Sequence, residues 1–290
     1  VAFTFPDAAL LAGGDGSSNY WLGGDGSDSL PGLGCPADRE PVSCPGGGSP
    51  GRGGDGGPRA KYGSPGEPGE PTDLPGGEGG TVDGCSTTGK GGEGATPDDD
   101  RDGAGATALG SLDEAGWSPA AGEDGLPGLP GQGGGGGGSF TDQGAGGGGG
   151  CGGCGGAPAL GGSNGGGSIA LLAFRSSISL DACSLHTSRG GRGGDAAAGQ
   201  NGQAGGLFGA AGGIACDGGS GGPGQRGGAS GAGAGGVSIG ILHAGDAPVL
   251  DEATLISFYV GVGGDPGTPV AGSPRTAANP GLAEAIVGLP

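Results

Sequence analysis

The sequence has few of the residues from which ordinary globular cores are built. It contains no methionine, two tryptophans, three tyrosines and six phenylalanines, and hydrophobic residues make up only 32% of its 290 residues. Glycine, by contrast, supplies 88 residues and proline 23, although glycine usually accounts for about 7% of a chain. Each glycine costs extra backbone entropy to order. The composition excludes a conventional side-chain core of this length, and it leaves disorder or an unusual fold as alternatives.

Basic residues are also scarce. Eleven lysines and arginines stand against 30 aspartates and glutamates, which gives a formal net charge of −19. Nucleic acids and anionic membranes attract clustered basic residues, so neither is expected as a partner. Such a chain is expected to repel itself and to bind cations. No apolar run is long enough for a membrane-spanning helix, and we expect no membrane insertion.

Signals for catalysis are missing as well. The chain has two histidines, His186 and His243, and neither has a compelling serine and aspartate around it. No phosphate-binding loop ending in G-K-[ST] is present, and the glycines occur in repeats rather than in one loop between a strand and a helix. We therefore predict that the protein is not an enzyme and needs no organic cofactor.

The glycines follow a period of three. Residues 146–156 read GGGGGCGGCGG, a Gly-Gly-X pattern, and a second run between residues 190 and 236 keeps the period with one extra residue. Three residues per turn belong to the polyproline II helix. Where glycine fills two of three positions, neighbouring helices can approach until their backbone groups hydrogen-bond. The pattern predicts a polyglycine II bundle, whose core is made of these bonds. The alternative is a collagen triple helix, but residues 63–71 and 125–133 hold only three Gly-X-Y triplets each.

The cysteines are expected to staple the bundle in an oxidising compartment. In a three-per-turn helix, Cys151 and Cys154 lie ~9.3 Å apart at their Cα atoms, too far for a disulfide. We expect them to bond to neighbouring segments, for example through Cys183, Cys216 or Cys85. Cys35 and Cys44 are close enough in sequence for a local disulfide. The alternative function for the CGGC motif is redox or metal chemistry. The number of cysteines is odd, which leaves one thiol free or bonded to another chain: Cys35, Cys44, Cys85, Cys151, Cys154, Cys183 and Cys216.

Two apolar blocks, residues 168–195 and 238–265, interrupt the glycine. They align without a gap at an offset of 70, so that Ser168 matches Ser238 and Leu185 matches Leu255. Short alternating apolar patterns predict strands in both, and no helical period extends beyond two turns. The unit is therefore a repeat of strands between glycine-rich arms.

The runs GGGSIALL and SISLDACSL with their flanking GG-x-GG segments resemble glycine-rich repeat proteins predicted at the surfaces of myxobacteria and related bacteria. The strand units are similar to right-handed β-helix coils. The arms resemble polyglycine II bundles of insect antifreeze proteins and of some phage tail-tip adhesins. The resemblance covers about residues 122–270. It implies an extracellular, rigid, structural or adhesive role without catalytic residues.

The N-terminal residues carry two further signals. In VAFTF, the side chains of Val1, Phe3 and Phe5 alternate onto one face of a strand. This strand either pairs within its own domain or adds to the next copy of the protein.

Residues 23–30 match the calcium-binding nonapeptide G-G-x-G-x-D-x-U, and an imperfect copy precedes them. The candidate Ca2+ ligands are Asp15, Asn19, Asp25 and Asp28. The alternative is a pair of Gly-Asp turns.

The sequence thus predicts three regions: residues 1–30 with a strand and Gly-Asp turns, a loop-rich Pro/Gly/acidic region 31–121, and residues 122–290 with polyglycine II arms and two β repeats. The expected fold is mostly β and irregular, with short β-solenoid or β-sheet units, disulfide staples and essentially no α-helix. The expected function is a secreted subunit of an extracellular fibre, filament or surface layer that assembles with itself. The alternative is a cell-surface adhesin or ice-binding protein that uses flat polyglycine II faces.

Overall fold

The computed structural model describes residues 44, 48–58, 60–71, 74–85, 90–97, 100–140, 144–212, 214–255 and 257–290. The chain divides into two compact units, each built from three separate stretches. Unit 1 comprises Val1–Asp100, Pro127–Ala157 and Gln200–Gly227. Unit 2 comprises Arg101–Leu126, Pro158–Gly199 and Gly228–Pro290.

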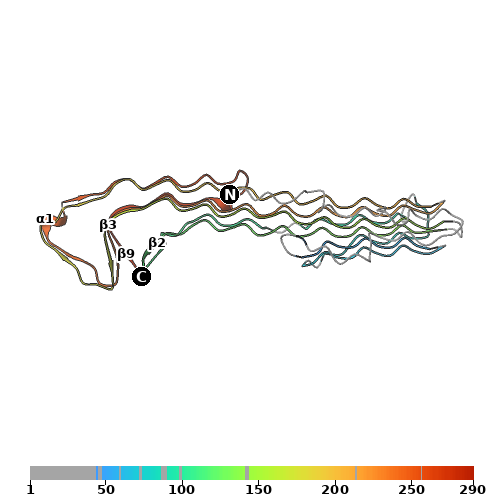
Figure 1. The fold of residues 1–290 in the computed structure, drawn as a ribbon, viewed down its shortest axis with the longest axis horizontal. Helices are drawn as coiled ribbons and strands as arrows, with labels where there is room; N and C mark the ends of the chain where they lie inside the picture. Colours follow the sequence, from blue (N-terminus) through green and yellow to red (C-terminus); the bar gives the residue numbers. More distant parts are fainter. Residues whose placement is uncertain are drawn as a thin grey trace. The chain divides into compact units, whose positions relative to one another are not determined.

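Long glycine-rich segments make up most of both units. They are drawn in Figure 1 as wavy tubes, since they are neither helix nor strand over most of their length. Their backbone groups are nevertheless paired between segments at every third residue. For example, Gly128, Gly131, Gly134 and Gly137 donate to the carbonyls of Gly156, Gly153, Gly150 and Gly147 at 2.8–2.9 Å.

One segment lies at the centre of unit 1. Residues 128–139 are all buried. Three successive residues of this segment reach six different neighbours through their N–H and C=O groups: Gly134 donates to Gly150 and accepts from Gly54, Gly135 donates to Gly92 and accepts from Gly219, and Gly136 donates to Ser64 and accepts from Gly80. One turn further on, Gly137 again donates to residues 144–157 and accepts from residues 48–57.

Unit 2 repeats this arrangement around residues 228–237, which are also buried. Three successive residues again reach six neighbours: Gly231 donates to Glu123 and accepts from Gly162, Ala232 donates to Thr276 and accepts from Ala106, and Gly233 donates to Gly194 and accepts from Gly267. Each unit therefore has a central segment whose backbone is hydrogen-bonded to neighbouring segments on all sides.

The strands of unit 2 lie where its glycine-rich segments end. A parallel sheet has the order β3-β6-β9, with β3 at Ser168–Phe174, β6 at Ser238–Ala244 and β9 at Ala283–Leu289. Two shorter parallel pairs join β4 (Ser179–Leu180) to β7 (Val249–Leu250) and β5 (Leu185–His186) to β8 (Phe258–Tyr259). Ser168 pairs with Ser238, at the offset of 70 that the repeat alignment predicts.

The alignment of Leu185 with Leu255 is wrong as a spatial correspondence. Leu185 pairs with Phe258 instead. The short helix α1 (Glu252–Leu255) occupies the second repeat at this point, and it shifts the following strand by three residues. Asp251 caps α1, since its Oδ1 accepts from the Thr254 N–H at 2.8 Å.

Several elements lie where the sequence predicts no regular structure, and β9, beyond both predicted repeats, is one of them. The hairpin of β1 (Ser111–Asp113) and β2 (Gly116–Ser118) falls in the loop-rich region, with Gly116, directly after the turn, at a φ of +120°. A 3-10 turn, η2, spans Pro274–Thr276.

A small apolar cluster surrounds β6. Ile239 and Leu242 are fully buried there, and Leu112 and Trp117 of the hairpin pack against them. The described part of the chain is thus mostly strands and irregular segments with essentially no helix, as predicted. Of the two forms predicted for the β units, the described residues adopt sheets, and no solenoid is seen in them.

The close approach of backbones generates a testable difference between glycines. A Cβ at Gly231 would lie 1.8 Å from the Ala104 carbonyl oxygen, whereas a Cβ at exposed Gly166 would meet nothing within 4 Å. We expect Gly231→Ala to lower the free energy of unfolding by about 1–3 kcal/mol or more, as overpacking does. Gly166→Ala should change it by less than about 1 kcal/mol. Urea unfolding followed by circular dichroism measures both, and equal stability of the two variants would contradict the packing described here.

Candidate functional site

The glycine-rich segments are self-similar, so a segment that slips by one turn keeps most of its backbone hydrogen bonds. Side chains that fix one register are therefore the candidate functional residues of this fold. In unit 1 they are cysteines. In unit 2 they are exposed charged and polar residues.

Two disulfides whose cysteines both lie among the described residues link segments of unit 1. Cys44 bonds to Cys154 and Cys85 bonds to Cys216, with Cα–Cα distances of 5.5 and 5.1 Å. The partners are separated by 110 and 131 residues in sequence. Closing loops of that length restricts the unfolded chain by about 4–5 kcal/mol in the chain-entropy model. The two disulfides also indicate that the protein folds in an oxidising environment.

The expectation that Cys151 and Cys154 do not bond to each other is confirmed. The partners suggested for them are wrong, because Cys85 and Cys216 bond to each other and Cys183 is free. Cys154 bonds to Cys44, and Cys151 is disulfide-bonded as well but not to Cys154. The predicted local bridge between Cys35 and Cys44 is wrong, because the fold brings Cys154 to Cys44 from 110 residues away. Both cysteines of CGGC are thus engaged in disulfides.

Cys183 is the free cysteine among the described residues. It is half-buried in the turn between β4 and β5, where its N–H donates to Thr254 Oγ1 at 2.9 Å. An odd number of cysteines leaves one thiol outside the internal disulfides. Among the described residues that thiol belongs to Cys183.

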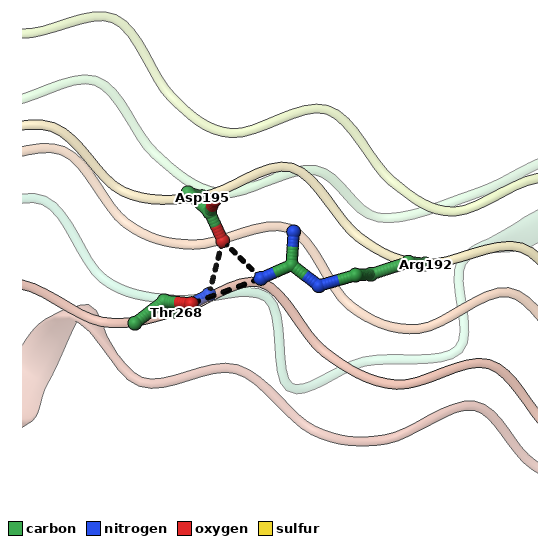
Figure 2. A network of polar contacts seen from close by, with 3 residues as sticks. All are labelled: Arg192, Asp195 and Thr268. Carbon is green, nitrogen blue, oxygen red and sulfur yellow. Dashed lines mark hydrogen bonds and ion pairs between the residues drawn. The ribbon is translucent and has the colours of Figure 1, made fainter.

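Arg192, Asp195 and Thr268 join two neighbouring segments of unit 2 (Figure 2). The guanidinium of Arg192 donates to the Asp195 carboxylate and, at 2.9 Å, to Thr268 Oγ1. The Thr268 N–H donates to Asp195 Oδ1 at 2.7 Å. These hydrogen bonds hold the pKa of Asp195 well below its usual range and raise the pKa of Arg192.

A second ion pair lies beside this network. Arg189 contacts Asp265 at 2.7 Å, and both side chains are more than 60% exposed. Exposed pairs of this kind contribute little to stability because solvent screens them. Their consequence is geometric, since Arg189 and Asp265 match only when residues 188–199 and 260–272 are in one register.

A third polar contact, made by Asp251, joins the two β repeats. Besides capping α1, Asp251 Oδ1 accepts from the Ala182 N–H at 3.1 Å. Hydrogen bonds from Thr254 and, to a smaller extent, from Ala182 lower the pKa of Asp251 to about 2.

The two histidines lie on different sheets. His186 of β5 is exposed, stacks on Tyr259 at 4.4 Å between ring centroids, and contacts Ser184 Oγ through Nε2 at 2.9 Å. His243 of β6 lies over Gly288 of β9. The Ser184–His186 contact is open to solvent, without the water exclusion that strengthens catalytic electrostatics.

The remaining predicted residues lie outside the described part of the chain. These are the assembly strand (Val1, Phe3 and Phe5), the Ca2+ ligands (Asp15, Asn19, Asp25 and Asp28) and Cys35. Among the described residues, no group of three or more His, Cys, Asp or Glu could hold a metal ion. None of the helices described is long and apolar enough to cross a membrane.

Comparisons with known proteins give no relative: no family model, no curated protein and no solved structure matches this chain.

The disulfides generate a prediction with an internal control. The double variant Cys44→Ser/Cys154→Ser should lose about 2–5 kcal/mol of unfolding free energy, the usual effect of removing a native disulfide. Cys183→Ser should leave the unfolding midpoint unchanged, because its thiol closes no loop. Urea unfolding without reductant tests both, and a midpoint for the double variant equal to that of the parent would contradict a stabilising role.

Asp251 generates a prediction about acid stability. Its pKa is about 2 in the folded protein and 3.8 ordinarily, so its contribution is present above pH 4 and is lost as the pH falls toward 2. Asp251→Asn cannot titrate but can still cap the helix. We expect the variant to lose less stability between pH 4 and 2 than the parent does. Asp246→Asn, which removes the same charge from an exposed turn, is the control. Parallel pH profiles for Asp251→Asn and the parent would contradict this assignment.

Proposed function

We propose that this chain is an extracellular structural protein whose glycine-rich segments form polyglycine II bundles. The observation that carries the proposal is the pair of central segments, each bonded to six neighbours by three successive residues. In a helix with three residues per turn, the three residues of a turn point in three directions, and each carries one donor and one acceptor. Six bonded neighbours with a period of three is the pattern expected of that lattice.

Such a bundle would be stiff. In the central segment of unit 1, a Cβ on any of eight glycines would lie within 1.8–2.1 Å of a backbone carbonyl oxygen: Gly128, Gly131, Gly133, Gly134, Gly135, Gly136, Gly137 and Gly138. The segments cannot move closer, and every turn is tied to its neighbours by hydrogen bonds. Stiffness of this kind suits a load-bearing or spacing element outside the cell.

Self-assembly is the second part of the proposal. In the described sheet β3-β6-β9, β9 lies at an edge and pairs only with β6. A sheet edge presents unpaired N–H and C=O groups that accept another strand. We infer that Val1–Phe5 of a second copy adds to this edge and links subunits into a fibre or layer.

A cell-surface adhesin is the second candidate function. It is favoured by a cavity in unit 2 whose lining combines an indole, amide side chains and apolar side chains.

The test is electron microscopy of the full chain together with light scattering. We expect the parent protein to form regular filaments or sheets. Val1→Ser/Phe3→Ser/Phe5→Ser should remain monomeric with an unchanged circular dichroism spectrum, because it removes the apolar face of the strand. Ala2→Ser/Thr4→Ser, on the opposite face, should assemble like the parent.

Two results would overturn parts of this proposal. Assembly of the triple variant would end the strand-addition mechanism. If the parent protein forms discrete particles at all concentrations, the polymer assignment is wrong and adhesion becomes the better-supported function.

A further inference from the structure

Each strand of the first β repeat is open on one side. Among the described residues, β3, β4 and β5 pair only with β6, β7 and β8 of the second repeat. In the sheet β3-β6-β9, the edge of β9 is the one that the proposed assembly assigns to Val1–Phe5. The opposite edge, formed by β3, remains open, and its backbone N–H and C=O groups can pair with another strand.

The sequence of β3 does not protect this edge. Natural edge strands commonly carry charged residues or proline, which discourage pairing. β3 reads SIALLAF and has neither over its seven residues. Ala170 and Leu172 are exposed in this strand, so apolar side chains as well as backbone groups are available at the edge. Segments of this length with β-favouring residues and without charge or proline pair readily with strands of other chains.

We propose that β3 of a second copy pairs with this edge, antiparallel and about a twofold axis at Leu171. In that register Ala170 lies opposite Leu172, and Ala173 lies opposite Ile169. Directly opposed side chains contact one another in an antiparallel pair, and a small residue across from a large one fills the space between the strands. The sequence of β3 is therefore complementary to itself when it is reversed, as a twofold contact between identical chains requires.

The residues beyond the strand fit the same register. Arg175 directly follows β3 and would lie opposite Gly167, which is exposed. Gly167 has no side chain, so the guanidinium meets no like charge at that position. The free edge of β9 in a second copy is the other strand edge of equal length, but in the proposed assembly it already holds Val1–Phe5. The second copy's β3 is therefore the occupant that the observations favour.

The contact is weak between single chains. Stable complexes bury about 800 Å² on each partner, and one seven-residue strand edge offers less than that. Chains that cannot exchange the N-terminal strand therefore stay monomeric at equilibrium and meet only transiently at β3. Copies joined in a filament present many β3 edges together, which raises the effective concentration of each contact. At this one step the inference rests on the proposed function: it predicts filaments that lie side by side in pairs.

Disulfide trapping tests the pairing without filaments. The full chain carries the three N-terminal serine substitutions, which remove strand addition, and Cys183→Ser, which removes the free thiol. Leu171→Cys then brings two thiols together at the twofold axis. Leu172→Cys is more exposed but leaves the two Cα atoms roughly 8 Å apart, beyond the range of a disulfide. Under a mild oxidant we expect covalent dimers from Leu171→Cys to form at least about tenfold faster than from Leu172→Cys.

A mixed experiment keeps the test decisive if Leu171→Cys does not fold. Ala170→Cys and Leu172→Cys, each in the same background, lie opposite each other in the proposed register. A mixture of the two variants should give the heterodimer at least about tenfold faster than either variant gives a homodimer. A slower or equal rate in the mixture would overturn the register and, with it, the twofold pairing.

Electron microscopy tests the same contact in assemblies. Filaments of the parent protein should lie side by side in pairs. Ala170→Lys/Leu172→Lys places two charges on the edge strand, and we expect single filaments of unchanged length. Val249→Lys, at an exposed position of β7, is the control and should keep the pairs.

Four further results would each overturn the inference. They are equal trapping rates for Leu171→Cys and Leu172→Cys, no covalent dimer from any cysteine variant, parent filaments that are all single, and paired filaments of the lysine variant. If the parent forms no filaments at all, the proposed assembly is wrong, and the trapping experiments alone decide whether β3 pairs with β3.

Discussion

The fold depends on one interaction, the hydrogen bond between backbones that are close enough to exclude a side chain. Around Gly231 and its neighbours, carbonyl oxygens occupy the positions that a Cβ would take. Glycine is usually a source of flexibility, but here many glycines contribute backbone donors and acceptors to a network of hydrogen bonds between segments. The hydrogen bonds replace the apolar contacts that the composition cannot supply, and among the described residues the apolar cluster lies around β6.

The sequence carries the period of this lattice but not its connections. A Gly-Gly-X repeat predicts a helix with three residues per turn and a rise of ~3.1 Å per residue. At that rise the Cα atoms of Cys151 and Cys154 are too far apart for a disulfide between them. The repeat does not indicate which segment neighbours which, because one Gly-Gly-X run offers the same groups as any other. The partner of Cys154 was unpredictable for that reason.

The strands were more predictable because their side chains differ from one position to the next. The match of Ser168 with Ser238 is a contact in the sheet. The alignment failed only beyond α1, where Asp251 caps a turn that the first repeat lacks. Asp181 stands at the equivalent position of the first repeat, so the residue alone does not signal the helix. In the folded protein Asp251 also accepts from the Ala182 N–H of the neighbouring repeat, a contact that the sequence does not indicate.

Glycine-rich segments and strands differ in how strongly they specify the register of their pairing. A glycine ladder has many registers of similar energy, whereas a strand with specific side chains has one. In unit 2 the ladder enters the sheet without a break: Gly165 donates to Ala234 and Ser168 to Val237, 69 residues apart in both cases (165 to 234, 168 to 237). The β5–β8 pair continues in the same way, since Thr187 donates to Tyr259 and Gly190 to Val262, 72 residues apart in both (187 to 259, 190 to 262). In unit 2 the sheets and the exposed side chains therefore both favour one register of the glycine segments. In unit 1, where the described residues form no strand, disulfides do so.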